Sequence, residues 1–236
     1  MSSYYSCLPH DEIREVFPDV FFVTGTYSGD IGGASWRFSR NMTVVRDGNA
    51  LSLINTVRLD DDGLKALESL GKVTNIIKIG SMHGVDDVFY KNRYDAKFWA
   101  MPGMQQELET DVELTADGEM PFSGASVFEF KTTKLPECIL RLDREGGIMI
   151  ACDALQNWLS PDDFFSDESR AMMQEMGFFT KANVGPVWMQ FNEPEAEDFQ
   201  RLKQIPFRHA LTGHGEPLLE TAHEDYSATF ERLFGV

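Results

Sequence analysis

Four side chains that could bind a metal ion follow apolar runs of the sequence: His83, Asp87, Asp153 and His214. Apolar runs of this length are typical of buried strands. Imidazole and carboxylate groups that meet at one edge of a sheet are ligands that Zn, Fe and Mn accept. If the strands bring these residues together, the chemistry they could support is activation of water by a bound metal ion.

Each of these residues also has a structural interpretation. His83 lies between Met82 and Gly84 and could hydrogen-bond the backbone of its turn. His214 stands between two glycines, which would let the backbone approach a ligand closely. Asp153 could be the N-cap of a helix that begins near residue 154. The local pattern leaves both interpretations open.

The first third of the chain predicts an antiparallel meander followed by a helix. Asp60 to Asp62 supply an N-cap and first-turn carboxylates, and Leu64, Leu67 and Leu70 then recur at helical spacing before Gly71. A near-continuous apolar run follows at once and is typical of a strand buried on both faces. The expected strands cover residues 20–24, 36–38, 42–45, 51–54 and 73–79.

The rest of the chain predicts more strands and several helices. Residues 161–206 are rich in Met and Phe, and we expect helical pieces there that cover the mouth of a pocket, although such a stripe is also typical of core. An amphipathic helix is expected over about 219–234. Because no linker or repeat marks a boundary, we expect one domain over residues 1–236. The expected strands cover residues 96–100, 126–131, 139–142, 148–152 and 209–211.

The composition excludes several classes of protein. Hydrophobic residues make up 42% and charged residues 25%, as in ordinary globular proteins. The 21 Lys and Arg against 38 Asp and Glu give a net charge of -17, so neither nucleic acid nor an anionic membrane surface is an expected partner. Three Cys at unrelated spacings predict no disulfide framework. With no signal-like start and no long apolar run, a cytoplasmic protein is expected.

The order of these segments resembles the metallo-β-lactamase fold superfamily, mostly metal-dependent hydrolases, and in particular a diverged, largely uncharacterised branch with an incomplete HxHxDH motif. The resemblance runs from about residue 41 to the C-terminus and implies an α+β fold, a four-layer αββα sandwich. Residues 41–57 resemble its opening hairpin. The other matching segments are 76–88 (IIKIGSMHGVDDV, in the place of HxHxDH), 132–138 (TTKLPEC, PGHTPGS-like), 151–155 (ACDAL, GDAL-like) and 211–217 (LTGHGEP, PGHGEP-like).

The resemblance implies a reduced set of metal ligands. His83 matches the first His of the loop, Asp87 its Asp, Asp153 the bridging Asp and His214 the last His. The remaining motif positions carry other residues, namely Asn55, Val85, Val88 and Lys134. Valine cannot bind a metal and a protonated lysine repels one. We therefore expect at most one Zn, Fe or Mn ion, or none.

Lys134 presents a choice between two roles. Its ammonium could enter the vacated site, neutralise Asp153 and substitute for the charge of a metal, or it could point to solvent from a loop.

Two functions follow as alternatives. The first is a mononuclear metal-dependent hydrolase in which His83 and Asp87 act at the catalytic centre. Its ligands would be Asp87, Asp153 and His214, with His83 as a further ligand or a proton shuttle. The second is a metal-free, catalytically inactive binding or regulatory protein on the same fold. In both, the partner is a small molecule of apolar character, because walls rich in Met adapt to apolar ligands.

Overall fold

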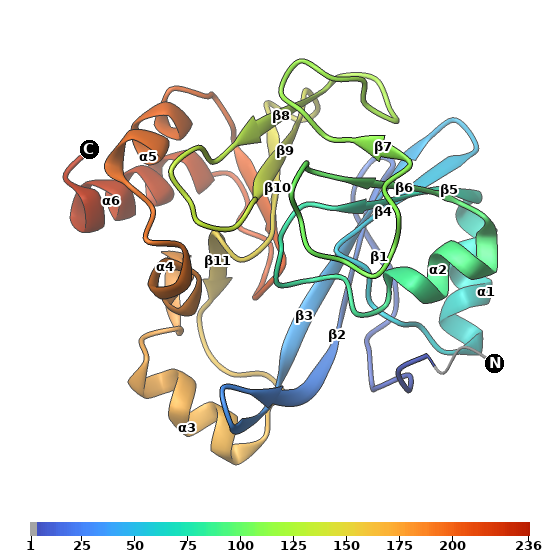
Figure 1. The fold of residues 1–236 in the computed structure, drawn as a ribbon, viewed down its shortest axis with the longest axis horizontal. Helices are drawn as coiled ribbons and strands as arrows, with labels where there is room; N and C mark the ends of the chain where they lie inside the picture. The colour runs from blue at the N-terminus through green and yellow to red at the C-terminus, as the bar shows by residue number, and fades with distance from the viewer. Residues whose placement is uncertain (1–3) are drawn as a thin grey trace.

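Two β-sheets lie at the centre of the computed structural model, which describes residues 4–236 (Figure 1). Helices α1 and α2 lie outside the seven-stranded sheet, and α5 and α6 lie outside the four-stranded sheet. The predicted αββα sandwich is confirmed. The helices are α1 (Asp61–Leu70), α2 (Asp87–Tyr94), α3 (Asp167–Glu175), α4 (Pro186–Asn192), α5 (Ala196–Lys203) and α6 (Ala222–Phe234).

The seven-stranded sheet follows the order of the chain from β1 to β7. Its largest unit is the hairpin of β2 and β3, which pair from Val20 and Val45 to Ile31 and Ala34 across a turn of two glycines with positive φ. The strands expected over 36–38 and 42–45 are therefore parts of one strand. The strands are β1 (Arg14–Phe17), β2 (Val20–Ile31), β3 (Ala34–Asp47), β4 (Ala50–Ile54), β5 (Lys72–Lys78), β6 (Lys97–Ala100) and β7 (Val112–Glu113).

The second sheet places two chain segments that are far apart in sequence side by side. Strands β10 and β13 pair in parallel, with Ala151 opposite Thr212. Because parallel strands end at the same edge, the residues that follow them lie next to each other. The four strands are β8 (Ala125–Glu129), β9 (Cys138–Leu142), β10 (Ile148–Ala151) and β13 (His209–Thr212).

A two-stranded sheet follows directly after β10. It pairs β11 (Leu155–Trp158) with β12 (Thr180–Val184) in the antiparallel sense. The alternative in which Asp153 caps a helix is therefore wrong, because the chain continues from Ala154 into a strand. Asp153 instead lies in the short connection between β10 and β11.

Successive side chains of β10 face opposite sides of the sheet, and this explains how the layers hold together. Ile148 and Ile150 face the core between the two sheets, whereas Met149 and Ala151 face the core beneath α5 and α6. A strand buried on both faces reads as a continuous apolar run, which is the pattern seen in the sequence. Among residues 4–236 no helix has the length and apolar character needed to cross a membrane.

Asp198 ties helix α5 to the loop that follows β8. Its carboxylate is fully buried and accepts hydrogen bonds from the amides of Lys131, at 3.0 Å, and Thr132, at 2.9 Å, from the Thr132 hydroxyl at 2.6 Å and from Arg201. Burial raises the pKa of Asp198, but the Thr132 hydroxyl, the two amides and Arg201 bring that pKa below its ordinary value.

We expect Asp198→Asn to lower the free energy of unfolding at pH 7 by about 1–3 kcal/mol, because an amide cannot accept all of these bonds. A depressed carboxyl pKa contributes stability above the unfolded pKa of about 3.9, and that contribution is lost as the pH falls. The difference between the two proteins should therefore shrink below about pH 4. Urea unfolding at pH 7 and pH 3 measures it. Glu197→Gln, at the exposed neighbouring position of α5, is the control. An equal loss in the control would contradict the prediction.

Candidate metal centre

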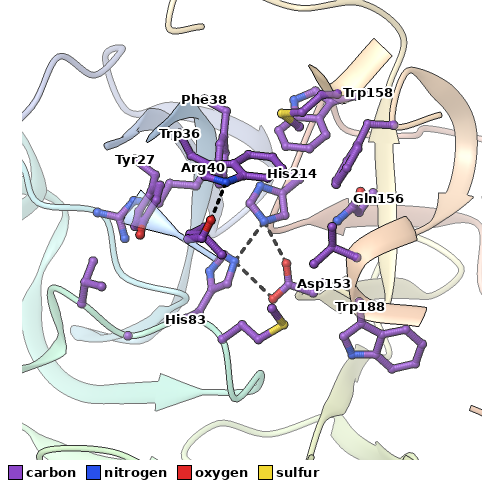
Figure 2. A pocket seen from close by; sticks show the side chains of 17 residues that line it. Tyr27, Trp36, Phe38, Arg40, His83, Asp153, Gln156, Trp158, Trp188 and His214 are labelled. Carbon is purple, nitrogen blue, oxygen red and sulfur yellow. Dashed lines mark hydrogen bonds and ion pairs between the residues drawn. The ribbon is translucent and has the colours of Figure 1, made fainter. Parts of the chain in front are cut away.

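Three side chains from separate parts of the chain meet at the edge of the sheets: His83, Asp153 and His214 (Figure 2). The Nε2 atoms of His83 and His214 are 3.0 Å apart. His214 Nε2 lies 3.0 Å from Asp153 Oδ1, and His83 Nε2 lies 3.5 Å from Asp153 Oδ2. Their candidate ligand atoms all lie within 4.8 Å of one another.

Backbone pairing accounts for this convergence. The amide of Gly213, next to His214, donates to the carbonyl of Ala151, two residues before Asp153, at 2.9 Å, and so extends the pairing of β10 and β13 to the edge where both side chains lie. His83 arrives from the loop after β5. A Cβ atom at Gly80, in that loop, would lie 2.7 Å from Cβ of Cys152, so only glycine lets the loop approach the end of β10 so closely.

The tautomer of His214 is set by a neighbouring carbonyl. Nδ1 of His214 lies 3.1 Å from the carbonyl oxygen of Ser39, and a carbonyl can only accept a hydrogen bond. Nδ1 therefore carries a hydrogen, and in the neutral ring Nε2 presents a lone pair to Asp153 and His83. Metal-binding histidines are commonly oriented in this way by a carbonyl on the other ring nitrogen.

The donor set fits a metal ion. Ligands bound at about 2.0–2.1 Å in tetrahedral or octahedral arrangements lie roughly 3–3.4 Å from one another. The two imidazole nitrogens are 3.0 Å apart, and the nearest oxygens of Asp153 lie 3.0 Å (Oδ1 to His214) and 3.5 Å (Oδ2 to His83) from them. The lone pair of His214 Nε2 also faces the carboxylate of Asp153, and two acceptors this close require a cation or a bridging proton between them. No other set of three His, Cys, Asp or Glu side chains within residues 4–236 comes together in this way.

The protonation states favour metal binding as well. Burial lowers the pKa of His83, which the charge of Asp153 only partly offsets, so its ring is held in the neutral form. Burial raises the pKa of Asp153, but the interactions with His83 and His214 outweigh it and leave that pKa below its ordinary value. Neutral imidazole and ionised carboxylate are the forms that bind metals.

Glu137 is a site residue that the sequence analysis did not identify. Its buried carboxylate accepts from the amide of Ala154 at 2.6 Å and from Trp188 Nε1 at 2.8 Å, so it holds the turn that carries Asp153. Burial and the charge of Asp153 raise the pKa of Glu137. The signal in the sequence was an acid directly before the apolar strand that begins at Cys138.

Asp87, the predicted fourth ligand, does not join the cluster, which corrects the expectation that all four residues converge. Its Oδ1 accepts from the Thr56 hydroxyl at 2.6 Å, at the first turn of α2. Burial raises the pKa of Asp87, while Thr56 and Lys78 lower it in part. Asp87 faces a separate cavity of about 160 Å³ that His83 and Lys78 also line.

Lys134 does not enter the site, so of its two possible roles the substitute for metal charge is wrong and the side chain points outward from its loop. Its ammonium is more than half exposed and pairs with Glu193 at 2.6 Å. The backbone of this loop is fixed by α4, because the amides of Lys134 and Leu135 donate to the carbonyl and side chain of Asn192 at 3.2 and 2.9 Å. The side chain that reaches inward from this segment is Glu137.

The other motif departures are also placed by the structure. Val85 is partly exposed and lines the cavities on both sides of His83, and Val88 lines the smaller one. Asn55 is buried and donates to the carbonyl of Ala151 at 3.2 Å, so it supports the end of β10. None of these residues contributes a donor to the cluster of His83, Asp153 and His214.

A cavity of about 350 Å³ opens beside the cluster. His83, Asp153 and His214 line one part of it, and aromatic and aliphatic side chains line the rest (Figure 2). The segment 161–206 contributes part of this wall, as well as core. The residues of this segment that line the cavity are Met173, Phe178, Val187 and Trp188.

No protein-family profile and no curated protein sequence matches this chain. Solved structures of metallo-β-lactamases do match it. DIM-1 is 13% identical with a TM-score of 0.61, and the match covers 96% of this chain and 99% of DIM-1. The mono-zinc form of FIM-1 from Pseudomonas aeruginosa is 12% identical with a TM-score of 0.60, covering 96% of each chain.

A metallo-β-lactamase from Erythrobacter litoralis is 14% identical with a TM-score of 0.58, and the match covers 94% of this chain and 92% of that one. These likenesses establish the fold over nearly the whole chain. At such identities they do not establish an activity, which has to be argued from the site itself.

Proposed function

We propose that this protein, which has the metallo-β-lactamase fold, is a hydrolase that uses a single Zn, Fe or Mn ion held by His83, Asp153 and His214. The observation that carries the proposal is the convergence of three donor residues: His83 Nε2 and His214 Nε2 lie 3.0 Å apart, and each lies next to one oxygen of Asp153, at 3.5 Å (Oδ2) and 3.0 Å (Oδ1). A metal ion bound there would polarise a substrate oxygen and make a water molecule more acidic. The mono-zinc form of FIM-1 is an example of this fold with one zinc.

The chain's own residues prepare the site for this chemistry. Asp153 supplies the negative charge, Glu137 holds the turn on which Asp153 lies, and the carbonyl of Ser39 orients His214. Three protein ligands leave a coordination position for water or substrate, as in catalytic metal sites. Asp87 stays outside the proposed reaction because Thr56 binds its carboxylate and it faces the adjoining cavity.

A specific observation favours the second candidate, a metal-free binding protein. The 3.0 Å distance between His83 Nε2 and His214 Nε2 is also that of a hydrogen bond. A proton shared between the two rings would satisfy the cluster without a metal ion. The two candidates therefore differ in whether the purified protein holds a metal and depends on it.

We expect metal analysis of the purified protein to return one equivalent of Zn, Fe or Mn per chain. Metal at 100 times its Kd stabilises a folded protein by about 2.7 kcal/mol. For a chain of this size that corresponds to a fall in Tm of roughly 5–10 °C when a chelator removes the ion. Readdition of the metal should restore Tm, together with any hydrolysis of a panel of esters, amides and phosphoesters.

Two results would contradict this proposal in different ways. Retention of two equivalents after chelation would show that residues outside the cluster complete a second site. Absence of metal after reconstitution, with Tm indifferent to the chelator, would favour the metal-free binding protein.

A further inference from the structure

Lys78, the last residue of β5, is the only buried lysine among residues 4–236, and 5% of it is exposed. Its ammonium donates one hydrogen bond, to the carbonyl of Gln105 at 3.3 Å. It forms no ion pair with a described Asp or Glu, whereas the ammonium groups of Lys91 and Lys134 both pair with carboxylates. Two of the three N–H groups of Lys78 are therefore without an acceptor among the residues that the structure describes.

Lys78 and Asp87 share the smaller cavity, of about 160 Å³, which adjoins the candidate metal centre. Oδ1 of Asp87 accepts from the Thr56 hydroxyl, but Oδ2 has no hydrogen-bond partner among residues 4–236 and is open to the cavity. A Cβ atom at Gly84 would lie 3.1 Å from Nζ of Lys78 and 2.5 Å from Oδ2 of Asp87, so both groups face the same space beside Gly84. The amine and the carboxyl group can therefore act on one molecule bound there.

The surroundings of Lys78 favour its neutral amine. Burial lowers the pKa of Lys78, and the charge of Asp87 offsets this only in part. A metal ion bound to His83, which lines the same cavity, would add a positive charge and disfavour the ammonium further. Neutral amines attack carbonyl carbons, and lysines removed from water are the ones that enzymes use to form imines. Lys78 therefore has the environment of a nucleophile, with or without the ion.

The rest of the wall determines the size and polarity of the reactant. Val88, Phe98 and Leu108 supply an apolar lining, and Tyr5, which is 65% exposed, lies where the cavity meets solvent. A protein cavity of about 150 Å³ holds a molecule of the size of benzene. The smaller cavity therefore fits a short carbon chain and not a fused ring system.

We propose that Lys78 forms imines with short aliphatic aldehydes and that Asp87 carries the protons of this reaction. Nζ of Lys78 attacks the carbonyl carbon to form a C–N bond, and Asp87 passes a proton from the nitrogen to the oxygen, which becomes a hydroxyl group. The C–O bond then breaks, the hydroxyl leaves as water with the second proton of the nitrogen, and a C=N bond remains. No oxidant or reductant is consumed. This activity goes beyond the proposed hydrolysis and does not use the metal ion.

The test is reductive trapping of the purified protein with butanal and cyanoborohydride, followed by peptide mass spectrometry. Lys72 is the internal control, because it lies at the exposed start of the same strand and forms no ion pair with a described residue. We expect Lys78 to be alkylated at least about 10-fold faster than Lys72, which corresponds to about 1.4 kcal/mol in the barrier. Alkylation of Lys78 at the rate of Lys72, or slower, would overturn the proposal.

A second aldehyde tests whether the cavity selects the reactant. With 1-naphthaldehyde, whose fused rings exceed the smaller cavity, we expect Lys72 to react faster than Lys78. If Lys78 reacted faster than Lys72 by the same ratio with both aldehydes, the cavity would not select a short chain and the proposed reactant class would be wrong. Treatment with a chelator should abolish any metal-dependent hydrolysis and leave Lys78 the faster lysine with butanal, so the two activities can fail separately.

Asp87→Asn assigns the proton transfer. Asparagine keeps an oxygen for the Thr56 hydroxyl but cannot carry a proton. Loss of the negative charge would by itself favour the neutral amine of Lys78 and speed its alkylation, so a slower reaction isolates the role of Asp87 in proton transfer. We expect Lys78 to react with butanal about 10-fold or more slowly in this variant, since general acid–base catalysis contributes about 10²–10⁴-fold.

Asp95→Asn, at the exposed C-cap of the same helix α2, is the matched control and should leave the rate at Lys78 unchanged. An unchanged or faster reaction in Asp87→Asn would contradict the role of Asp87. If that variant does not fold, the comparison of Lys78 with Lys72 in the unaltered protein still decides.

Discussion

Replacing Arg40 with methionine is expected to lower the free energy of unfolding by about 3–5 kcal/mol, the cost of leaving a buried charge without its partner. Arg40 and Asp86 form an ion pair in which the side chains are 8% and 2% exposed. Asp86 also accepts from the amide of Arg58 at 2.7 Å, and Arg40 donates to two carbonyls besides. The methionine removes the donors of Arg40 and leaves the carboxylate of Asp86 buried without its cation, with the amide of Arg58 still donating to it.

The controls separate the lost pair from a general effect of the substitution. Arg37→Met, at an exposed position of the same strand β3, should change stability by less than about 0.5 kcal/mol. The double variant Arg40→Met with Asp86→Leu should recover much of the loss, because an apolar pair can replace a buried ion pair. Urea unfolding followed by circular dichroism measures all three. A loss in Arg40→Met no larger than in Arg37→Met would contradict the prediction.

The ion pair also links the fold to the site. It joins β3 to the residues just before α2, and this same loop carries His83 after β5. Both members of the pair stand where the sequence pattern is least informative. Arg40 lies in a polar stretch of β3 between Ser39 and Asn41, and nothing local indicates that its partners are Asp86 and the carbonyls of Thr26 and Thr56.

The convergence of His83, Asp153 and His214 could be anticipated because it depends on strand ends. Each follows an apolar run, and the motif order implied that these runs share an edge. The parallel pairing of β10 and β13 then brings the last two together. Here the relevant information is local in sequence, since hydrophobic pattern and turn residues mark where a strand ends.

Long-range contacts account for what the sequence analysis missed. The polar residues at 39–41 led us to expect two strands where there is one, β3. Ser39, Arg40 and Asn41 are in fact buried. Each has a hydrogen-bond partner in another segment, namely His214, Thr56 and Gly215 respectively. The inward role of Glu137 could not be separated from that of Lys134 three positions earlier, because α4 fixes which side chain of that loop points inward. Tertiary packing therefore determines which of these polar side chains are buried and which point toward the site.

His214→Ala is expected to weaken the affinity for the single metal ion by more than about 100-fold, because loss of an outer-shell partner alone commonly costs 10–100-fold. His214 provides one of the three donor atoms, at 3.0 Å from both His83 and Asp153. Competition with a chromophoric chelator measures the affinity, and circular dichroism confirms that the variant folds.

His223→Ala is the matched control, since His223 is a half-buried histidine that contacts the carbonyl of Lys203 at 2.9 Å, outside the cluster. Its metal affinity should stay within about twofold of the unaltered protein, because a change of that size is under about 0.5 kcal/mol. The chelator should lower Tm in His223→Ala as it does in the unaltered protein, and should leave Tm of His214→Ala unchanged, because that variant no longer holds the ion. Retained metal affinity in His214→Ala, or an equal loss of metal affinity in His223→Ala, would show that the bound metal lies elsewhere on this acidic protein. The assignment of His83, Asp153 and His214 as its ligands would then have to be abandoned.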